Sequence, residues 1–297
     1  MIAPTMRIGV DLGGTKTEAI ALGTDGAVLS RRRVPSAQGS YSATIAVIKS
    51  LVEAVENELG RTGSVGIGIP GTISPATGLV KNANSTWLIG QPLDRDLADA
   101  LGRPVRLAND ADCFALSEAS DGAGAGAATV FGVILGTGVG GGLVAHGRLI
   151  SGPNAIAGEW GHNPLPWPTD AERPGPACYC GRHGCIETFL SGPGLARDHG
   201  TGQAADQLAA AAEAGDPAAE ASLARYEDRL ARALASVINL FDPHAIILGG
   251  GLSRMERLYR SVPARWSRWV FSDSVSTRLL PPLHGDSSGV RGAAWLW

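Results

Sequence analysis

The sequence predicts an α/β protein of two domains, on three observations. Short apolar stretches typical of strands alternate with stretches whose apolar residues recur at helical spacing. Glycine clusters directly follow three of the strand-like stretches, as expected where the backbone approaches a ligand closely. The chain has 297 residues, which favours two domains over one, and its 44% hydrophobic and 18% charged residues are globular values.

The chain opens with a predicted antiparallel meander. Its strands and turns are expected at Met6–Asp11, Gly13–Lys16, Thr17–Leu22, Gly23–Gly26 and Ala27–Val34. A helix is then expected from Ser40 to Leu59, because its apolar residues recur at helical spacing and Gly60 supplies the stop. A buried strand at Ser64–Ile69 follows.

The middle of the chain continues the alternation of helix and strand. The expected elements are a helix at Leu93–Leu101, strands at Val105–Leu107, Thr129–Leu135 and Leu143–Leu149, and a helix from Asn109 or Asp110 to about Ser120. Residues Gly136–Gly142 are expected to form a turn. The stretch Gly122–Ala145 carries no charge over 24 residues, but its nine glycines favour a buried strand and a turn over a membrane span.

The last third predicts long helices. Apolar residues of Ala218–Phe241 lie on one helical face, which favours core packing, with a dimer face as the less favoured additional use. A strand at Ala245–Leu248 leads into Gly249–Gly251, another helix follows Ser253, and Ser288–Trp297 is expected to be a short apolar helix.

Charge and cysteine content exclude several classes of protein. The net charge is −3 and no basic face is evident, so nucleic-acid binding lacks electrostatic support. Nothing at the N-terminus resembles a signal peptide, and no membrane attachment is expected. Only four cysteines are present, three of them clustered, so we expect a cytoplasmic protein.

The cysteine cluster predicts a structural zinc site. Cys178, Cys180 and Cys185 lie within eight residues and His162 lies upstream, which supplies the Cys₃His set of a closed tetrahedral site. The alternatives are a disulfide knot or three unrelated buried cysteines. Two carboxylates that zinc does not need, Glu159 and Glu187, flank these ligands and suggest a substrate site.

The three glycine clusters suggest phosphate binding. They are Gly13–Gly14, Gly136–Gly142 and Gly249–Gly251, and free backbone amides in such turns form anion-binding nests. Plain tight turns are the alternative. A G-x-G-x-x-G pattern occurs from Gly136 to Gly141, but a dinucleotide fold is rejected because a strand, not a helix, is expected to follow. No Walker sequence is present either.

Together the motifs resemble the ROK family of bacterial sugar kinases. The motifs that carry the likeness are Asp11–Glu18, Gly68–Gly71, Asn109–Asp112, Gly136–Gly138, Gly158–His162 and Cys178–Glu187. The sequence is most similar to the manno(fructo)kinases, through Lys81–Trp87, Gly161–Trp167 and His284–Trp295. The resemblance implies an actin/hexokinase-like (ribonuclease H-like) fold of two α/β domains with a central cleft. Residues 1–113 with 284–297 would form the small domain, and 114–283 the large one.

The resemblance also implies the roles of individual residues. Asp110 would be the general base, with a plain helix cap as the alternative, and Asp112 would be structural. The sugar-binding residues would be Gly71, Asn84, Asn109, Glu159, His162 and Glu187. MgATP would be held by Asp11, Gly13, Gly14, Thr15, Lys16, Thr137, Gly138, Gly250 and Gly251. Structural Zn²⁺ would be bound by His162, Cys178, Cys180 and Cys185, with the second ring nitrogen of His162 left to donate to the sugar.

The function implied is an ATP-dependent hexose kinase that phosphorylates the six-position hydroxyl of fructose, with mannose as a further substrate. Glucokinase and N-acetylhexosamine kinase are the alternatives within the family. From another class, a sugar-responsive ROK regulator is disfavoured because the chain begins at its first phosphate strand, without the helix-turn-helix domain of such regulators. A non-catalytic sugar-binding protein is disfavoured by Asp110 and the glycine clusters. A homodimer is expected.

Overall fold

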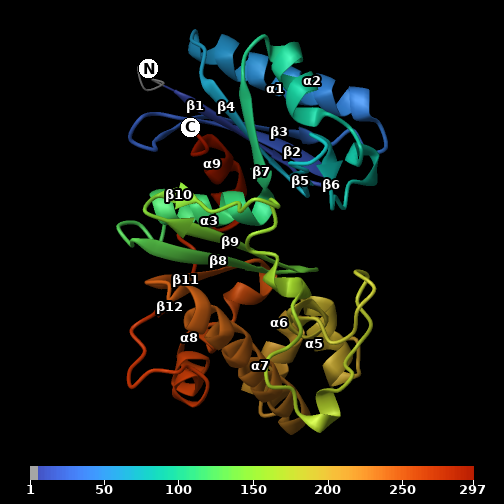
Figure 1. The fold of residues 1–297 in the computed structure, drawn as a ribbon, viewed down its shortest axis with the longest axis vertical. Helices are drawn as coiled ribbons and strands as arrows, with labels where there is room; N and C mark the ends of the chain where they lie inside the picture. The colour runs from blue at the N-terminus through green and yellow to red at the C-terminus, as the bar shows by residue number, and fades with distance from the viewer. Residues whose placement is uncertain (1–5) are drawn as a thin grey trace.

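The computed structural model describes residues 6–297, which form two five-stranded sheets stacked along the long axis of the molecule (Figure 1). Together they form the hexokinase-like two-domain α/β fold that the sequence predicts. Within the described part of the chain, no helix combines the length and apolarity that crossing a bilayer requires.

The first sheet has the strand order β3-β2-β1-β4-β7. Its strands are β1 (Arg7–Leu12), β2 (Lys16–Leu22), β3 (Val28–Pro35), β4 (Ser64–Ile69) and β7 (Val105–Asn109). Strands β1 to β3 are antiparallel, as the expected meander requires, whereas β4 and β7 run parallel to β1. Helices α1 (Tyr41–Leu59) and α2 (Leu93–Leu101) cover its outer face (Figure 1). A hairpin of β5 (Thr72–Ile73) and β6 (Val80–Lys81) extends from it.

The second sheet has the order β10-β9-β8-β11-β12. Its strands are β8 (Thr129–Leu135), β9 (Val139–Ala145), β10 (Arg148–Leu149), β11 (Ala245–Gly249) and β12 (Arg278–Leu280). The helices packed beneath it are α4 (Ile186–Leu190), α5 (Gly192–His199), α6 (Ala205–Glu213), α7 (Pro217–Phe241) and α8 (Leu258–Ser261) (Figure 1). Their apolar faces and the strands form the largest hydrophobic core.

The homodimer stays a prediction.

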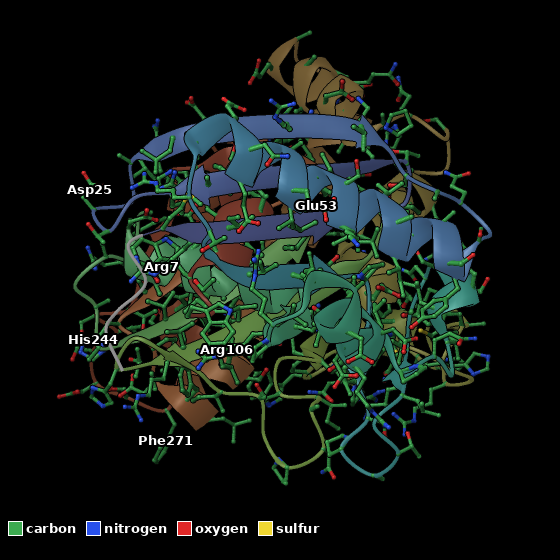
Figure 2. The ribbon with its side chains drawn as sticks, turned by 90° about the horizontal axis from the view of Figure 1, so that it is seen from above. Arg7, Asp25, Glu53, Arg106, His244 and Phe271 are labelled. Atoms are coloured by element: carbon green, nitrogen blue, oxygen red, sulfur yellow. The ribbon has the colours of Figure 1, made fainter. Side chains whose placement is uncertain are left out.

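Two helices, α3 (Asp110–Ser120) and α9 (Ser288–Ala294), lie between the sheets (Figure 1). Glycines permit this close packing: a Cβ on Gly66 of β4 would overlap the carbonyl of Ala293, and one on Gly292 would overlap that of Cys113. The chain end is held by cation–π contacts, in which Arg7 lies over Trp295 and Arg106 over Trp297. Figure 2 labels the two arginines. The C-terminal helix therefore returns to the first sheet.

The short 3₁₀ helices complete the chain. They are η1 (Thr86–Leu88), η2 (Trp160–His162), η3 (Asp170–Glu172), η4 (Gly251–Arg254), η5 (Pro263–Arg268) and η6 (Gly285–Ser287). Where one helix was expected after Ser253, the chain forms three separate short helices, η4, α8 and η5. The domain division stays a prediction, and its boundary at residue 113 falls inside α3, a helix that packs on β8, β9 and α9.

One strand expectation was wrong. The strand expected at Leu143–Leu149 is β9, which begins earlier, at Val139, and ends at Ala145, while β10 is a separate two-residue strand. The glycines Gly140–Gly142 are therefore strand residues paired with β8 and not part of a turn. They are needed because a Cβ on Gly141 would lie 2.8 Å from the Trp160 ring and one on Gly142 2.7 Å from the Ala111 carbonyl.

Candidate functional site

A cleft of about 1430 Å³ opens between the two sheets. Of the residues predicted to bind substrate or nucleotide, those that line it are Asp11, Gly13, Gly14, Asn84, Asp110 and Gly250. They come from the end of β1, the segment after β6, the start of α3 and the end of β11. Strand ends thus bring together residues separated by more than two hundred positions, as is typical of binding sites in α/β proteins.

Asp110 lies at the first position of α3 and faces the cleft. The Asp110 side chain is accessible to solvent through the cleft. Protein atoms nevertheless surround the carboxyl group, and this partial removal from water raises its pKa. A hydrogen bond of 2.8 Å from the Ala111 N–H to Oδ1 opposes the shift, and the charge of Glu159 adds to it. The helix cap is Asn109, whose side chain accepts from the same N–H, so capping alone does not explain Asp110.

Asp11 lies close to Asp110 at the end of β1. Burial, followed by the charges of Asp110 and Glu18, raises the pKa of Asp11 to about 7, with Arg33 acting in the opposite direction. Neighbouring carboxylates in a buried site favour a bound cation, and carboxylate oxygens are ligands that Mg²⁺ prefers. The residues present therefore fit a magnesium ion carried with a nucleotide.

The first predicted phosphate turn, which begins at Gly13–Gly14, is held by two side chains that follow β3, and one of them, Gln38, also lines the cleft. Ser36 Oγ donates to the Gly13 carbonyl at 2.7 Å and Gln38 Nε2 to the Gly14 carbonyl at 2.7 Å. Because a trans peptide places N–H opposite C=O, these bonds point the following N–H groups, of Gly14 and Thr15, the other way. Thr15 and Lys16 are exposed at this turn.

The second predicted phosphate turn, Gly136–Gly138, joins β8 to β9 and lies by a further cavity of about 810 Å³. Predicted nucleotide residues Thr137 and Gly251 line this cavity, together with alanines of α6 and Leu252 and Met255. Charged residues also line it, namely Asp206, Glu213, Arg254, Glu256 and Arg257. The apolar part of the cavity, next to two glycine turns, suits a nucleoside. Gly138 packs against the Glu187 carboxylate, since a Cβ there would lie 2.7 Å from Oε2.

The predicted sugar residues differ in how free their side chains are. Asn84 lines the cleft and Glu159 is exposed. Asn109 already caps α3 and also donates to the Gly71 carbonyl at 3.4 Å. At Gly71 an added Cβ would meet Ala83 Cβ at 2.8 Å, so this glycine makes room for the neighbouring segment, whereas room for the sugar was expected.

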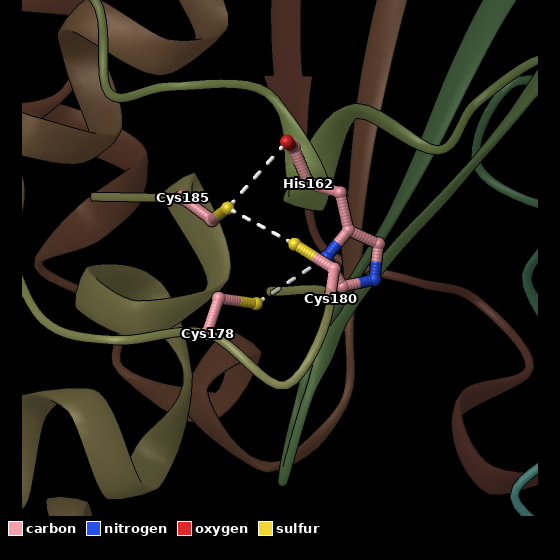
Figure 3. A group of neighbouring side chains, drawn as sticks. All are labelled: His162, Cys178, Cys180 and Cys185. Carbon is pink, nitrogen blue, oxygen red and sulfur yellow. Dashed lines mark hydrogen bonds between the residues drawn. The ribbon is translucent and has the colours of Figure 1, made fainter. Parts of the chain in front are cut away.

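The four predicted zinc ligands come together as expected (Figure 3). One ligand atom from each of His162, Cys178, Cys180 and Cys185 lies within 4.8 Å of the others. The thiols are free, with Cys180 Sγ and Cys185 Sγ 3.6 Å apart, and form no disulfide. Three thiols and one imidazole nitrogen at this spacing fit a tetrahedral Zn²⁺ site.

The orientation of His162 differs in one respect from the expectation. Its Nδ1 faces Cys178 Sγ at 3.5 Å, and its Nε2 is 2.8 Å from the Tyr179 hydroxyl, so the nitrogen expected to face the sugar already has a partner. The Tyr179 ring also meets the imidazole edge to face. Tyr179 was not among the residues predicted from the sequence, although its position between two predicted ligands was a signal.

A buried ion-pair network fastens the loop between His162 and Cys178 to α7. Glu172 accepts from Arg229 Nε at 2.7 Å and from Arg232 at 2.9 Å, and these three side chains are at most 8% exposed. Arg232 also donates to the Trp167 carbonyl at 2.8 Å. Hydrogen bonds from the arginines lower the pKa of Glu172 to about 2, against the effect of burial. This network was not predicted from the sequence, because its partners are 57 and 60 residues apart.

Three comparisons place these features among known proteins. Residues 7–297 match the model of the ROK family. The chain is 41% identical over 300 residues to N-acetyl-D-glucosamine kinase from Yersinia pseudotuberculosis serotype O:1b (strain IP 31758), covering 98% of each. Its fold is similar to that of the ROK hexokinase from Thermus thermophilus, with a TM-score of 0.86, 31% identity and coverage of 98% and 97%. A ROK family glucokinase from Streptomyces griseus, solved with glucose and AMPPNP, has a TM-score of 0.77 and 29% identity, covering 98% of both chains.

Proposed function

The chain belongs to the ROK family and is an ATP-dependent sugar kinase, and on that premise we propose that it phosphorylates the six-position hydroxyl of N-acetyl-D-glucosamine. The observation that carries the proposal is the position of Asp110, at the first turn of α3, in a cleft that also contains Asn84, Asp11 and the first phosphate turn. The substrate is proposed from the 41% identity to the Yersinia kinase over 98% of both chains.

Asp110 would act as the general base. Phosphoryl transfer passes through a loose transition state, so the protein mainly positions the reactants and balances charge. The sugar hydroxyl becomes acidic as it attacks, and the Asp110 carboxylate accepts its proton, a contribution of about 10²–10⁴-fold. The raised pKa of Asp110 makes it a stronger base than an exposed aspartate.

The remaining residues would bind and orient the nucleotide and the sugar. The amides of Gly14 and Thr15 and the turn at Gly136–Gly138 would hold the phosphates, and the cavity beside Gly251 would hold the nucleoside. Asp11 would bind the Mg²⁺ that accompanies ATP and that neutralises phosphate charge when bound. Asn84, Glu159 and Glu187 would form hydrogen bonds with sugar hydroxyls. A sugar analogue that lacks one of these hydroxyls would leave a protein group unpaired and would bind more weakly.

The zinc ligands would hold the sugar-binding segment together. His162 lies three residues after Glu159, and Cys185 two residues before Glu187, so one ion fixes both carboxylates relative to each other. A closed Cys₃His set leaves no coordination position for substrate or water. We therefore assign zinc a structural role, with no part in phosphoryl transfer.

Fructose is the second candidate substrate. It is favoured by the likeness of Lys81–Trp87, Gly161–Trp167 and His284–Trp295 to the manno(fructo)kinases. Both sugars present a primary hydroxyl at the six position, so the same base serves either one. The acetamido group distinguishes them and requires additional space in the cleft.

A coupled assay of ADP release over a panel of hexoses tests the proposal. The panel contains N-acetyl-D-glucosamine, N-acetyl-D-mannosamine, glucose, mannose and fructose. We expect the highest kcat/KM with N-acetyl-D-glucosamine. A higher kcat/KM with fructose would overturn the assignment of substrate, and no ADP release with any of the five would overturn the assignment as a hexose kinase.

A further inference from the structure

We propose that Glu187 couples the sugar site to the second phosphate turn, so that sugar and nucleotide each raise the affinity for the other. The inference rests on the proposed function, which puts the sugar on one side of this residue and phosphate on the other. It makes Glu187 a positioning residue for the nucleotide in addition to a sugar ligand.

One oxygen of the Glu187 carboxylate contacts the second phosphate turn. Its Oε2 accepts a hydrogen bond of 2.9 Å from the N–H of Val139, the residue directly after the turn Gly136–Gly138. A Cβ on Gly138 would lie 2.7 Å from the same oxygen. One carboxylate oxygen is thus committed to the turn, and in the proposed function the other oxygen accepts a hydrogen bond from a sugar hydroxyl.

The same segment also holds the other end of the turn. The Gly192 N–H, at the start of α5, donates to the Gly136 carbonyl at 2.8 Å. Ser191, the preceding residue, donates through its N–H to the Glu187 carbonyl at 3.1 Å. The turn is therefore held at both ends by residues 187–192, and a displacement of this segment displaces the turn.

Two physical effects give the coupling its sign. A sugar hydroxyl that donates to the free oxygen fixes the carboxylate plane, which orders the Val139 N–H and the turn before phosphate binds. The same hydrogen bond disperses negative charge that faces the phosphates. Coupling between two sites is reciprocal and typically changes affinity by about 5–150-fold, and we expect a value near the lower end here.

Two glycines of this turn supply a matched pair of variants. Alanine at position 138 pushes against Glu187 Oε2, whereas alanine at position 136 projects into open space. Both glycines lie outside the region of positive φ, so alanine introduces no backbone strain at either position. Both lie on the phosphate side, so an effect of only one of them on sugar binding must pass through Glu187.

Calorimetric titration of the zinc-loaded protein with N-acetyl-D-glucosamine, with and without Mg·AMPPNP, tests the inference. We expect Gly138→Ala to weaken sugar binding, in the absence of nucleotide, by about 10-fold, and Gly136→Ala by less than about 2-fold. In the wild-type protein Mg·AMPPNP tightens sugar binding, and in Gly138→Ala this gain falls. Equal effects of the two alanines on sugar affinity, or no coupling in the wild-type protein, would overturn the inference.

A second measurement separates this inference from the proposed function. Hydrogen exchange at the Val139 amide needs no ligand: Glu187→Ala should speed it, and Asn84→Ala, which changes another proposed sugar residue, should leave it unchanged. If the sugar fails to bind but the exchange result holds, the substrate assignment fails and the Glu187 link stands. Unchanged exchange in Glu187→Ala would overturn the link itself.

Discussion

Replacing Asp112 by asparagine is expected to stabilise the protein more strongly as the pH rises. Asp112 lies in the first turn of α3, and its Oδ1 is buried without a hydrogen-bond partner among the described residues. Burial, then the charges of Asp110 and Glu159, raises the pKa of Asp112 from 3.8 to about 7. The asparagine side chain has nearly the same shape and cannot ionise.

The sign and size of this pH dependence follow from the linkage between proton binding and unfolding. An acid whose pKa is raised by folding loses its proton more readily in the unfolded chain, so ionisation favours unfolding. The penalty is absent well below pH 3.8, grows as the pH rises toward 7, and is constant above that range. For this shift the penalty increases by about 2–3 kcal/mol between pH 5 and pH 8.

Urea unfolding of the wild-type protein and Asp112→Asn at pH 5 and pH 8 measures this difference. Comparing the two proteins at each pH cancels the pH dependence of zinc binding, which they share. Asp99→Asn, at an exposed position of α2, is the surface control for the substitution itself. A stability difference between wild type and Asp112→Asn that is the same at both pH values would refute the protonated state of Asp112.

The remaining predictions concern the base, the metal and the ion-pair network. Asp110→Asn should lower turnover by about 10²–10⁴-fold while calorimetry still detects sugar binding, and near-normal turnover would remove Asp110 as the base. Cys180→Ser should release zinc, measured by metal analysis, and raise KM for the sugar more than for ATP; an unchanged sugar KM in the metal-free variant would contradict the role of the ion. Glu172→Gln removes the carboxylate that Arg229 and Arg232 share, although each arginine keeps a second partner, Asp198 or Asp228, and should lower the free energy of unfolding by about 1.5–3 kcal/mol. A loss below about 0.5 kcal/mol in urea titration would argue against the network.

The local sequence was sufficient to predict those features whose signal lies within a few residues. The helix α1 begins after Ser40, whose side chain accepts from the Ala43 N–H, and ends at Gly60, with a φ of 65°. Such caps are visible in the sequence. The zinc cluster was equally accessible, because thiols and an imidazole identify their chemistry by residue type and spacing.

Long-range packing explains what the sequence did not show. Gly140–Gly142 suggested a turn, but these glycines lie in β9 because Trp160 and α3 approach its backbone closely. The bond from Val139 N–H to Glu187 joins residues 48 positions apart, and nothing local indicates it. Likewise, Tyr179 engages the second nitrogen of His162 only once the loop is folded. These features depend on tertiary contacts, which periodicity and motifs do not encode.

We propose that this cleft transfers the terminal phosphoryl group of ATP to a sugar hydroxyl, with Asp110 as the base. Phosphorus NMR of the protein with Mg·ATP and N-acetyl-D-glucosamine follows both products of this transfer, with Asp110→Asn measured in parallel. We expect ADP and a sugar 6-phosphate to form in equal amounts, and at least about 100-fold more slowly in the variant. ADP accumulating with inorganic phosphate and no sugar phosphate, or equal rates in the two proteins, would contradict it.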